Sequence, residues 1–258
     1  MSMDICLCPR GGRKWEIPRD LVRMRYRKRI SGLPSVCACG HTYSLDHSQI
    51  CKLGGFIHMR HDNVKRLFAY QAKQCFRDVE LEPALQPLSG ETFEYKTANT
   101  KPEARSDIRV RSFWTNMQNA FFDTKVIYPF ASSYSSKTPA ALYRSASLAK
   151  RREYEKRIIT IENASFTPLV MNSTGGMCPE MQIAIKHLAR LQAERKKESY
   201  SKVMSVLRCR FAFAISKSAL VCLRGSRTVR SRVFDKFPRS SLDIPATLAI
   251  AEARVLEY

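Results

Sequence analysis

The chain has 258 residues, and its 44% hydrophobic content excludes a disordered protein and allows one large domain or a core with a small satellite. Its 44 Lys and Arg against 23 Asp and Glu give a net charge of +21. This charge favours a polyanionic partner. Because the basic residues are spread along the chain, DNA, or alternatively RNA, is favoured over a membrane surface or a small-molecule substrate.

No apolar run reaches the roughly 20 residues that a membrane span requires, and charges interrupt the apolar middle that a signal peptide would need. We therefore expect an intracellular protein, in the nucleus if DNA is its partner. The nine cysteines are then expected to be free thiols or metal ligands, and not a disulfide framework.

The predicted elements begin with a basic leader, 1–36, which carries an amphipathic pattern around 19–30 and breaks at Gly32 and Pro34. A segment rich in Cys and His, 37–61, follows. Apolar residues at helical spacing then predict a helix over 57–76. Alternation closed by prolines predicts a strand over 79–88, and 89–103 is polar and predicts a loop.

Two further strands are predicted over 105–112 and 120–128. Thr138 followed by Pro139 predicts a helix start, with the helix continuing to about 157. One or two strands are expected within 158–173, a turn at Gly175 and Gly176, and two helices over 179–197 and 200–223. A last helix is expected near 245–257.

The predicted fold class is α/β (α+β), with a core of order α-β-β-β-α-β over 57–174. A small zinc knuckle, 37–61, precedes this core, and a basic helical extension, 175–258, follows it as appended C-terminal helices.

The segment 37–61 offers metal ligands. Thiolates and imidazole suit tetrahedral zinc, and four protein ligands would close the site and make it structural. The predicted Zn²⁺ ligands are Cys37, Cys39, His47 and Cys51, with His41, His58 and His61 in reserve. The alternative is a group of buried free cysteines with surface histidines.

Two acids lie within the predicted strands. Asp123 and Lys125 share one face of their strand, and Asp107 can share that face from the neighbouring strand. Carboxylates on adjacent strands suit a hard divalent cation such as Mg²⁺ or Mn²⁺. The cation would activate water and neutralise phosphate charge, with Lys125 positioning the nucleophile. Acids and lysines are also common on solvated strand faces.

The order of these motifs resembles the PD-(D/E)XK nucleases, and within them the restriction-like endonuclease region at the C-terminal end of non-LTR (LINE-type) retrotransposon proteins. The resemblance covers about 33–160. The matching residues are, in order, Cys37, Cys39, His47 and Cys51; Arg60 and His61; Glu82 and Pro83; Arg105, Ser106 and Asp107; Asp123; and Lys150 with Tyr154. Ser106 stands where the family has proline.

The resemblance implies a metal-dependent DNA endonuclease that nicks its substrate. Asp107 and Asp123 would hold the metal, either Lys125 or Lys150 would be the catalytic lysine, and Tyr154 would assist. Nucleic acid would contact Arg60, His61, Arg105 and Arg109. Two alternatives remain open, a nucleic-acid-binding remnant or domesticated protein whose site is inactive, and a retroelement product with no present role.

Overall fold

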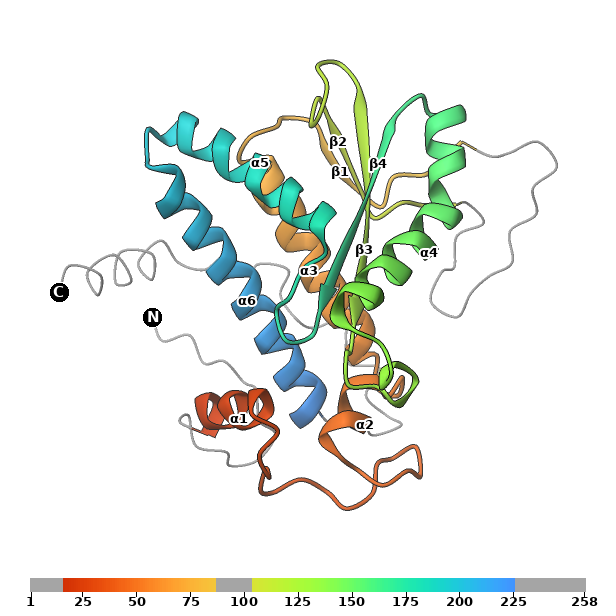
Figure 1. The fold of residues 1–258 in the computed structure, drawn as a ribbon, viewed down its shortest axis with the longest axis vertical. Helices are drawn as coiled ribbons and strands as arrows, with labels where there is room; N and C mark the ends of the chain where they lie inside the picture. The colour runs from red at the N-terminus through yellow and green to blue at the C-terminus, as the bar shows by residue number, and fades with distance from the viewer. Residues whose placement is uncertain (1–15, 87–103, 226–258) are drawn as a thin grey trace.

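A four-stranded mixed sheet forms the centre of the molecule (Figure 1). The computed structural model describes residues 16–86 and 104–225. The sheet order is β1-β2-β3-β4, with antiparallel pairs β1/β2 and β2/β3 and a parallel pair β3/β4. The strands are β1 (Val79–Leu81), β2 (Ile108–Arg111), β3 (Asn119–Ile127) and β4 (Ser165–Asn172).

Six helices lie in the described part of the chain, and the last four follow the predicted order. They are α1 (Glu16–Arg25), α2 (Leu45–Ile50), α3 (Phe56–Lys73), α4 (Pro139–Thr160), α5 (Pro179–Lys196) and α6 (Tyr200–Arg224), with a short 3₁₀ turn η1 (Ser132–Tyr134) before α4. From α3 to β4 the order is α-β-β-β-α-β. The α/β fold class is therefore confirmed.

The two faces of the sheet are covered by different helices. Ile108 and Phe122 point to one face, where they pack with residues of α3, α5 and α6 in the main core. Phe121 points to the other face and packs against Ile158 of α4 in a smaller cluster. The alternation of side chains along β3 thus divides the core into two clusters, and α4 also reaches the larger one through Leu142 and Ala146.

Local signals explain most helix starts. Thr138 caps α4, its hydroxyl accepting a hydrogen bond from the Ala141 amide, and Pro139 occupies the first turn, as predicted. Cys178 caps α5 in the same way through its sulfur. Ser199 caps α6.

The strand predicted over 79–88 is shorter than expected. Pairing with β2 extends only over Val79–Leu81, and Glu82 then adopts a positive φ of 53°, which ends the regular strand. An isolated bridge, Ala84 with Arg105, continues the contact between the two segments. The first residues of 158–173 complete α4, so this stretch supplies one strand, β4.

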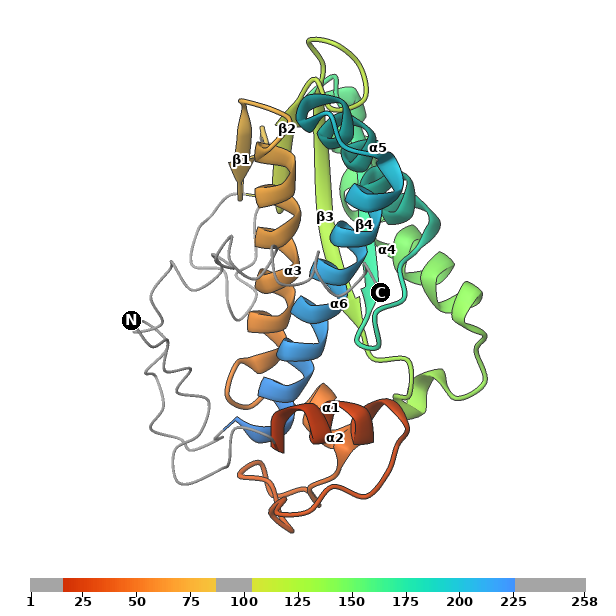
Figure 2. The ribbon, with the colours of Figure 1, turned by 90° about the vertical axis from the view of Figure 1, so that its left-hand side faces the viewer.

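The C-terminal helices predicted over 179–197 and 200–223 are present as α5 and α6. They contribute buried residues such as Leu188 and Phe211 to the same core as the sheet. In Figure 2, α6 runs beside α3, and its C-terminal end lies near α1 and α2. The expected loop over 89–103 and helix near 245–257 lie outside the described residues.

Among the described residues, no helix is both long and apolar enough to be a candidate membrane span.

Candidate functional site

The predicted zinc ligands come together at one end of the molecule. A tight turn carries the first two: the Cys37 amide donates to the His41 carbonyl at 2.8 Å, and the Gly40 amide donates to the Cys37 carbonyl at 2.8 Å. α2 carries the third, and Ser44, its N-cap, accepts from the His47 amide. Cys51 follows directly after α2. The end of the predicted segment 37–61 belongs to α3, so from here on the name knuckle denotes 36–51, which carries the four ligands.

The spacing of the four ligand atoms fits a tetrahedral zinc site. All of them lie within 4.8 Å of one another. The Cys51 sulfur is 3.8 Å from the sulfurs of Cys37 and Cys39, and the Cys39 sulfur is 3.3 Å from His47 Nε2. A Zn–S bond of about 2.3 Å implies a tetrahedral S–S edge of about 3.8 Å, so the sulfur separations match. The cluster is suited to Zn²⁺.

The thiols of the cluster are electrostatically unequal. A hydrogen bond from the His41 backbone lowers the pKa of Cys39 to about 6, which favours its thiolate. Burial raises the pKa of Cys51. Zinc prefers deprotonated sulfur, so binding of the ion would release a proton from Cys51.

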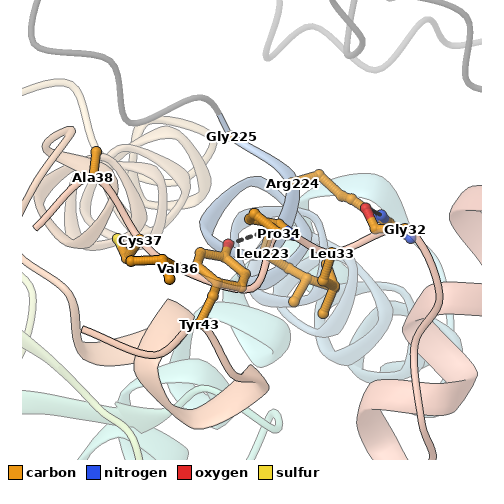
Figure 3. Close-up of a pocket in the computed structure, with 10 residues that line it drawn as sticks. All are labelled: Gly32, Leu33, Pro34, Val36, Cys37, Ala38, Tyr43, Leu223, Arg224 and Gly225. Carbon is orange, nitrogen blue, oxygen red and sulfur yellow. Dashed lines mark hydrogen bonds between the residues drawn. The ribbon is translucent and has the colours of Figure 1, made fainter. Parts of the chain in front are cut away.

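The knuckle is seated on the C-terminal end of α6 (Figure 3). The Tyr43 hydroxyl donates to the Leu223 carbonyl at 2.5 Å, and Gln49 Nε2 donates to the Ala219 carbonyl at 3.0 Å. A hollow of about 280 Å³ lies between Pro34, Val36 and this end of α6. The phenol of Tyr43, the aromatic residue of the knuckle, is therefore committed to docking.

The predicted acids also come together. Ile108 of β2 pairs with Phe122 of β3 in antiparallel register. Asp107 directly precedes Ile108 and Asp123 directly follows Phe122, so the two aspartates lie opposite each other. Both side chains are largely withdrawn from solvent, with exposed fractions of 14% for Asp107 and 5% for Asp123. The register therefore places a half-buried carboxylate, Asp107, opposite a buried one, Asp123.

Asp107 is held from several directions. Its Oδ2 accepts from the Thr124 amide at 2.6 Å and lies 3.0 Å from His61 Nε2, and its Oδ1 is 3.9 Å from Lys65 Nζ. Burial raises the pKa of Asp107, but the bond to His61 outweighs it, and the pKa lies below its usual value. Asp107 is therefore ionised near neutral pH.

His61 belongs to the same group, on the first turns of α3. Burial lowers its pKa, but hydrogen bonds to Asp107 and Asp62 outweigh burial and raise the pKa to about 10. Burial raises the pKa of Asp62, but hydrogen bonds from His61 and Lys65 outweigh burial and lower the pKa to about 2. His61 is therefore an imidazolium near neutral pH.

Asp123 has the opposite electrostatics. Burial, reinforced by the charge of Asp107, raises its pKa to about 7. Lys150 Nζ lies 2.8 Å from Asp123 Oδ2, yet this buried oxygen has no hydrogen bond of acceptable geometry. One carboxylate oxygen at the centre of the site thus has a cationic neighbour but no hydrogen bond.

The two candidate lysines occupy different positions. Lys150 projects from α4 to Asp123 and also lies 5.2 Å from the centroid of the Tyr154 ring. Lys125 is on the same strand as Asp123 but forms no ion pair within 4.0 Å with any described residue. Burial next to Asp123 raises the pKa of Tyr154, which keeps its phenol protonated. The geometry brings Lys150 and Tyr154, and not Lys125, to the acids.

Two charged residues near Asp107 and Asp123 were not predicted from the sequence. Lys65 is buried on α3 and contacts Asp62 at 2.9 Å and Glu82 at 2.8 Å, in addition to Asp107. Glu153 lies 3.3 Å from Lys150 on α4. The sequence signal was their spacing. Lys65 follows His61 by four residues and Glu153 follows Lys150 by three, and residues at such spacings share a helix face.

The basic residues expected to contact nucleic acid all have protein partners. Arg60 is 2% exposed and donates to the Gln49 side chain and carbonyl, each at 3.1 Å. Its buried guanidinium joins α3 to the knuckle, so in this structure it does not offer a phosphate contact. Arg105 donates to the Glu82 carbonyl at 2.8 Å, and Arg109 pairs with Asp78 and Glu80.

No family model matches the chain, and a search of curated proteins finds no match. The resemblance drawn from motif order therefore stays a prediction.

Proposed function

We propose that the chain is a divalent-metal-dependent endonuclease that nicks DNA and derives from the restriction-like region of a non-LTR retrotransposon protein. The observation that carries this proposal is the pairing of Asp107 and Asp123 across β2 and β3, with Lys150 against Asp123. Two acids on neighbouring segments of a sheet, with a lysine from a helix against one of them, are the groups that phosphodiester cleavage of this kind uses.

The donor set suits a hard divalent cation. Asp107 is ionised, and Asp123 has a buried oxygen without a hydrogen bond. The surrounding group contains more acids than bases: Asp62, Glu82, Asp107, Asp123 and Glu153 against His61, Lys65 and Lys150. With Asp123 ionised, the excess is two negative charges, which matches one Mg²⁺ or Mn²⁺ ion.

Asp107 and Asp123 would hold the ion, which when bound supplies a water of lowered pKa and neutralises charge on the phosphate. The remaining work falls to the protein. His61 and the Thr124 amide fix the orientation of Asp107. Lys150, steadied by Glu153 and by the Tyr154 ring, places a positive charge where negative charge develops on a phosphate oxygen.

The net charge of +21 supports a nucleic acid as the substrate. Basic side chains that track phosphates supply affinity without sequence choice, and this affinity falls as the salt concentration rises.

A plasmid-nicking assay tests the proposal. We expect relaxation of supercoiled DNA by the purified protein with Mg²⁺ or Mn²⁺ and none in EDTA-treated reactions. Asp107→Asn and Asp123→Asn should each lower the rate by about 100-fold or more, the scale of losing one electrostatic group at a reacting centre. Their DNA affinity should be unchanged or slightly higher, since removing an acid reduces repulsion of phosphate.

Glu198→Gln is the matched control, because Glu198 is an acid on the surface whose partner is Lys202. It should nick like the wild type. Equal nicking by all four proteins would contradict the assignment of the acids.

A second candidate is a nucleic-acid-binding protein with an inactive site. One observation favours it: Asp107 and Asp123 each already have a cationic partner within the chain, His61 and Lys150. DNA binding that falls steeply with salt, with no nicking at any metal concentration, would favour this candidate over the nuclease.

A further inference from the structure

The turn that ends α1 exposes a set of basic and aromatic side chains. Arg25, Tyr26, Lys28 and Arg29 are all exposed, and Tyr26 has 67% of its surface in solvent. Within the described part of the chain, Arg25, Lys28 and Arg29 form no ion pair. This turn, 25–29, therefore presents positive charge and an aromatic ring that the fold does not use.

The backbone of the turn is a built structure. The Lys28 amide donates to the Arg23 carbonyl at 2.8 Å and the Arg27 amide to the Met24 carbonyl at 3.2 Å, the two bonds of a Schellman helix end. Arg27 occupies the left-handed position with φ 50°, where glycine is usual. An arginine at this position implies that its side chain has a compensating role.

The side chain of Arg27 clamps the turn to the knuckle. It donates to both carboxylate oxygens of Asp46 in α2, at 2.9 and 2.8 Å, and its guanidinium lies 4.7 Å from the centroid of the Phe130 ring. The Tyr128 hydroxyl also donates to Asp46. The turn is thus fixed beside α2, at the end of the molecule shown in Figure 2.

We infer that the turn 25–29 is a contact site for single-stranded nucleic acid. Tyr26 would stack on a base, and Arg25, Lys28 and Arg29 would contact the flanking phosphates. The combination of an exposed ring with cations on both sides is what sequence-tolerant single-strand binding requires, because every base has a π face. A duplex hides those faces, so the ring distinguishes a single strand from a double strand.

This site is independent of the nuclease proposal, since it uses none of the acids and does not require metal at Asp107 or Asp123. The zinc-loaded full chain is therefore tested by fluorescence anisotropy with labelled oligo(dT) and with a duplex of equal length. Tyr26→Ala should weaken oligo(dT) binding about 5-fold to 100-fold, the range for losing one stacked base, and leave duplex binding within about twofold.

Three variants sharpen this test. Tyr26→Phe retains the ring and should bind oligo(dT) like the wild type. Tyr70→Ala removes another exposed tyrosine, on α3 with 49% of its surface in solvent, and should have no effect. Lys28→Ala combined with Arg29→Ala should lower the slope of log affinity against log salt for oligo(dT) by about 0.7 for each phosphate that is no longer neutralised.

Unchanged oligo(dT) binding by Tyr26→Ala would overturn the inference, and so would an equal loss for single strand and duplex. Capture of phosphatidylserine vesicles that depends on Tyr26, without an effect on oligo(dT), would assign the turn to a membrane surface and also overturn it. Loss of oligo(dT) binding together with intact plasmid nicking would support the turn as a separate site.

Discussion

The knuckle brings three sulfur atoms and an imidazole nitrogen together, whereas the acidic site places a cation of the chain against each of its central carboxylates. At the knuckle, the sulfurs of Cys37 and Cys39 lie at the spacing of a tetrahedron from Cys51. At the acidic site, His61 lies against Asp107 and Lys150 against Asp123. Both sites are rich in ligand atoms, but only at the second does a cation of the chain lie against each of the central ligands.

This difference separates two ways of using a metal. Three thiolates brought this close together require an ion for the fold to be stable, so the knuckle should depend on zinc structurally. Carboxylates that already have cationic partners are stable without an ion, so a divalent cation at Asp107 and Asp123 would affect activity and hardly affect folding. Four measurements test this difference between the two sites.

Removal of zinc should have the largest effect. Structural zinc contributes apparent binding energies of about 10 kcal/mol or more in isolated zinc fingers, so Cys37→Ser should lose zinc and lower the melting temperature strongly. Metal content by mass spectrometry and a thermal melt measure both effects. Cys209→Ser, at an exposed cysteine outside the cluster, is the control and should retain zinc. Wild-type protein free of zinc would contradict the assignment.

Arg60 connects the two regions, since it lies beside His61 on α3 and donates to Gln49 of the knuckle. Arg60→Met should lower the free energy of unfolding by about 2 to 4 kcal/mol, because two buried acceptors lose their donor. Urea denaturation measures this change. Arg66→Met removes an exposed arginine from the same helix and should stay within about 0.5 kcal/mol of the wild type. Equal stability of the two variants would contradict this role of Arg60.

The two lysines near Asp123 should differ in their effect on nicking. Lys150→Ala should reduce the nicking rate by about 100-fold, because Lys150 faces the acid, and Lys125→Ala should change it by less than about threefold. Initial rates at saturating Mg²⁺ compare them. The reverse order would assign the catalytic role to Lys125 and contradict the role that the ion pair gives to Lys150.

The fourth measurement concerns the pH dependence of stability. The pKa of Asp123 is raised to about 7 in the folded chain, against about 3.9 when unfolded, so the folded state holds its proton to higher pH. The stability that this protonation provides is fully present below about pH 4 and is lost as the pH rises to about 7. Asp123→Asn should remove this decrease in stability between about pH 4 and pH 7.

Urea denaturation of the zinc-loaded protein in magnesium-free buffer, from pH 4 to 7, measures the slope. Asp62→Asn is the control, because the pKa of Asp62 is lowered to about 2, so its contribution is lost only as the pH falls below about 4, and this variant should keep the wild-type slope between pH 4 and 7. A wild type and Asp123→Asn with parallel curves would show that Asp123 titrates normally.

Much of the fold could be predicted because local signals and tertiary packing agree. Thr138 and Pro139 begin α4 as their cap and first-turn preferences require, and the alternation in β3 places Phe121 and Phe122 on opposite faces. The ligands of the knuckle could be predicted because they lie within 15 residues, where chain connectivity alone brings them together.

The acidic site was only partly predictable. Asp107 and Asp123 follow from strand pairing, but the choice between Lys125 and Lys150 depends on how α4 crosses the sheet, which no local pattern specifies. Lys65 was missed because a buried lysine looks like an ordinary polar position until its three acidic neighbours are brought near. The burial of Arg60 could not be predicted either, because its hydrogen-bond acceptors belong to Gln49 of the knuckle and not to α3.

The seating of the knuckle on α6 has a consequence during synthesis. Tyr43 and the Leu223 carbonyl that it binds are 180 residues apart, so the docking surface leaves the ribosome long after the cysteines. At about 5 to 20 residues per second, the interval is roughly 10 to 40 s. The cysteines and His47 are complete before this interval ends, so zinc capture can precede docking, and a nascent chain stalled before α6 would hold the ion on a knuckle that is not yet docked on α6.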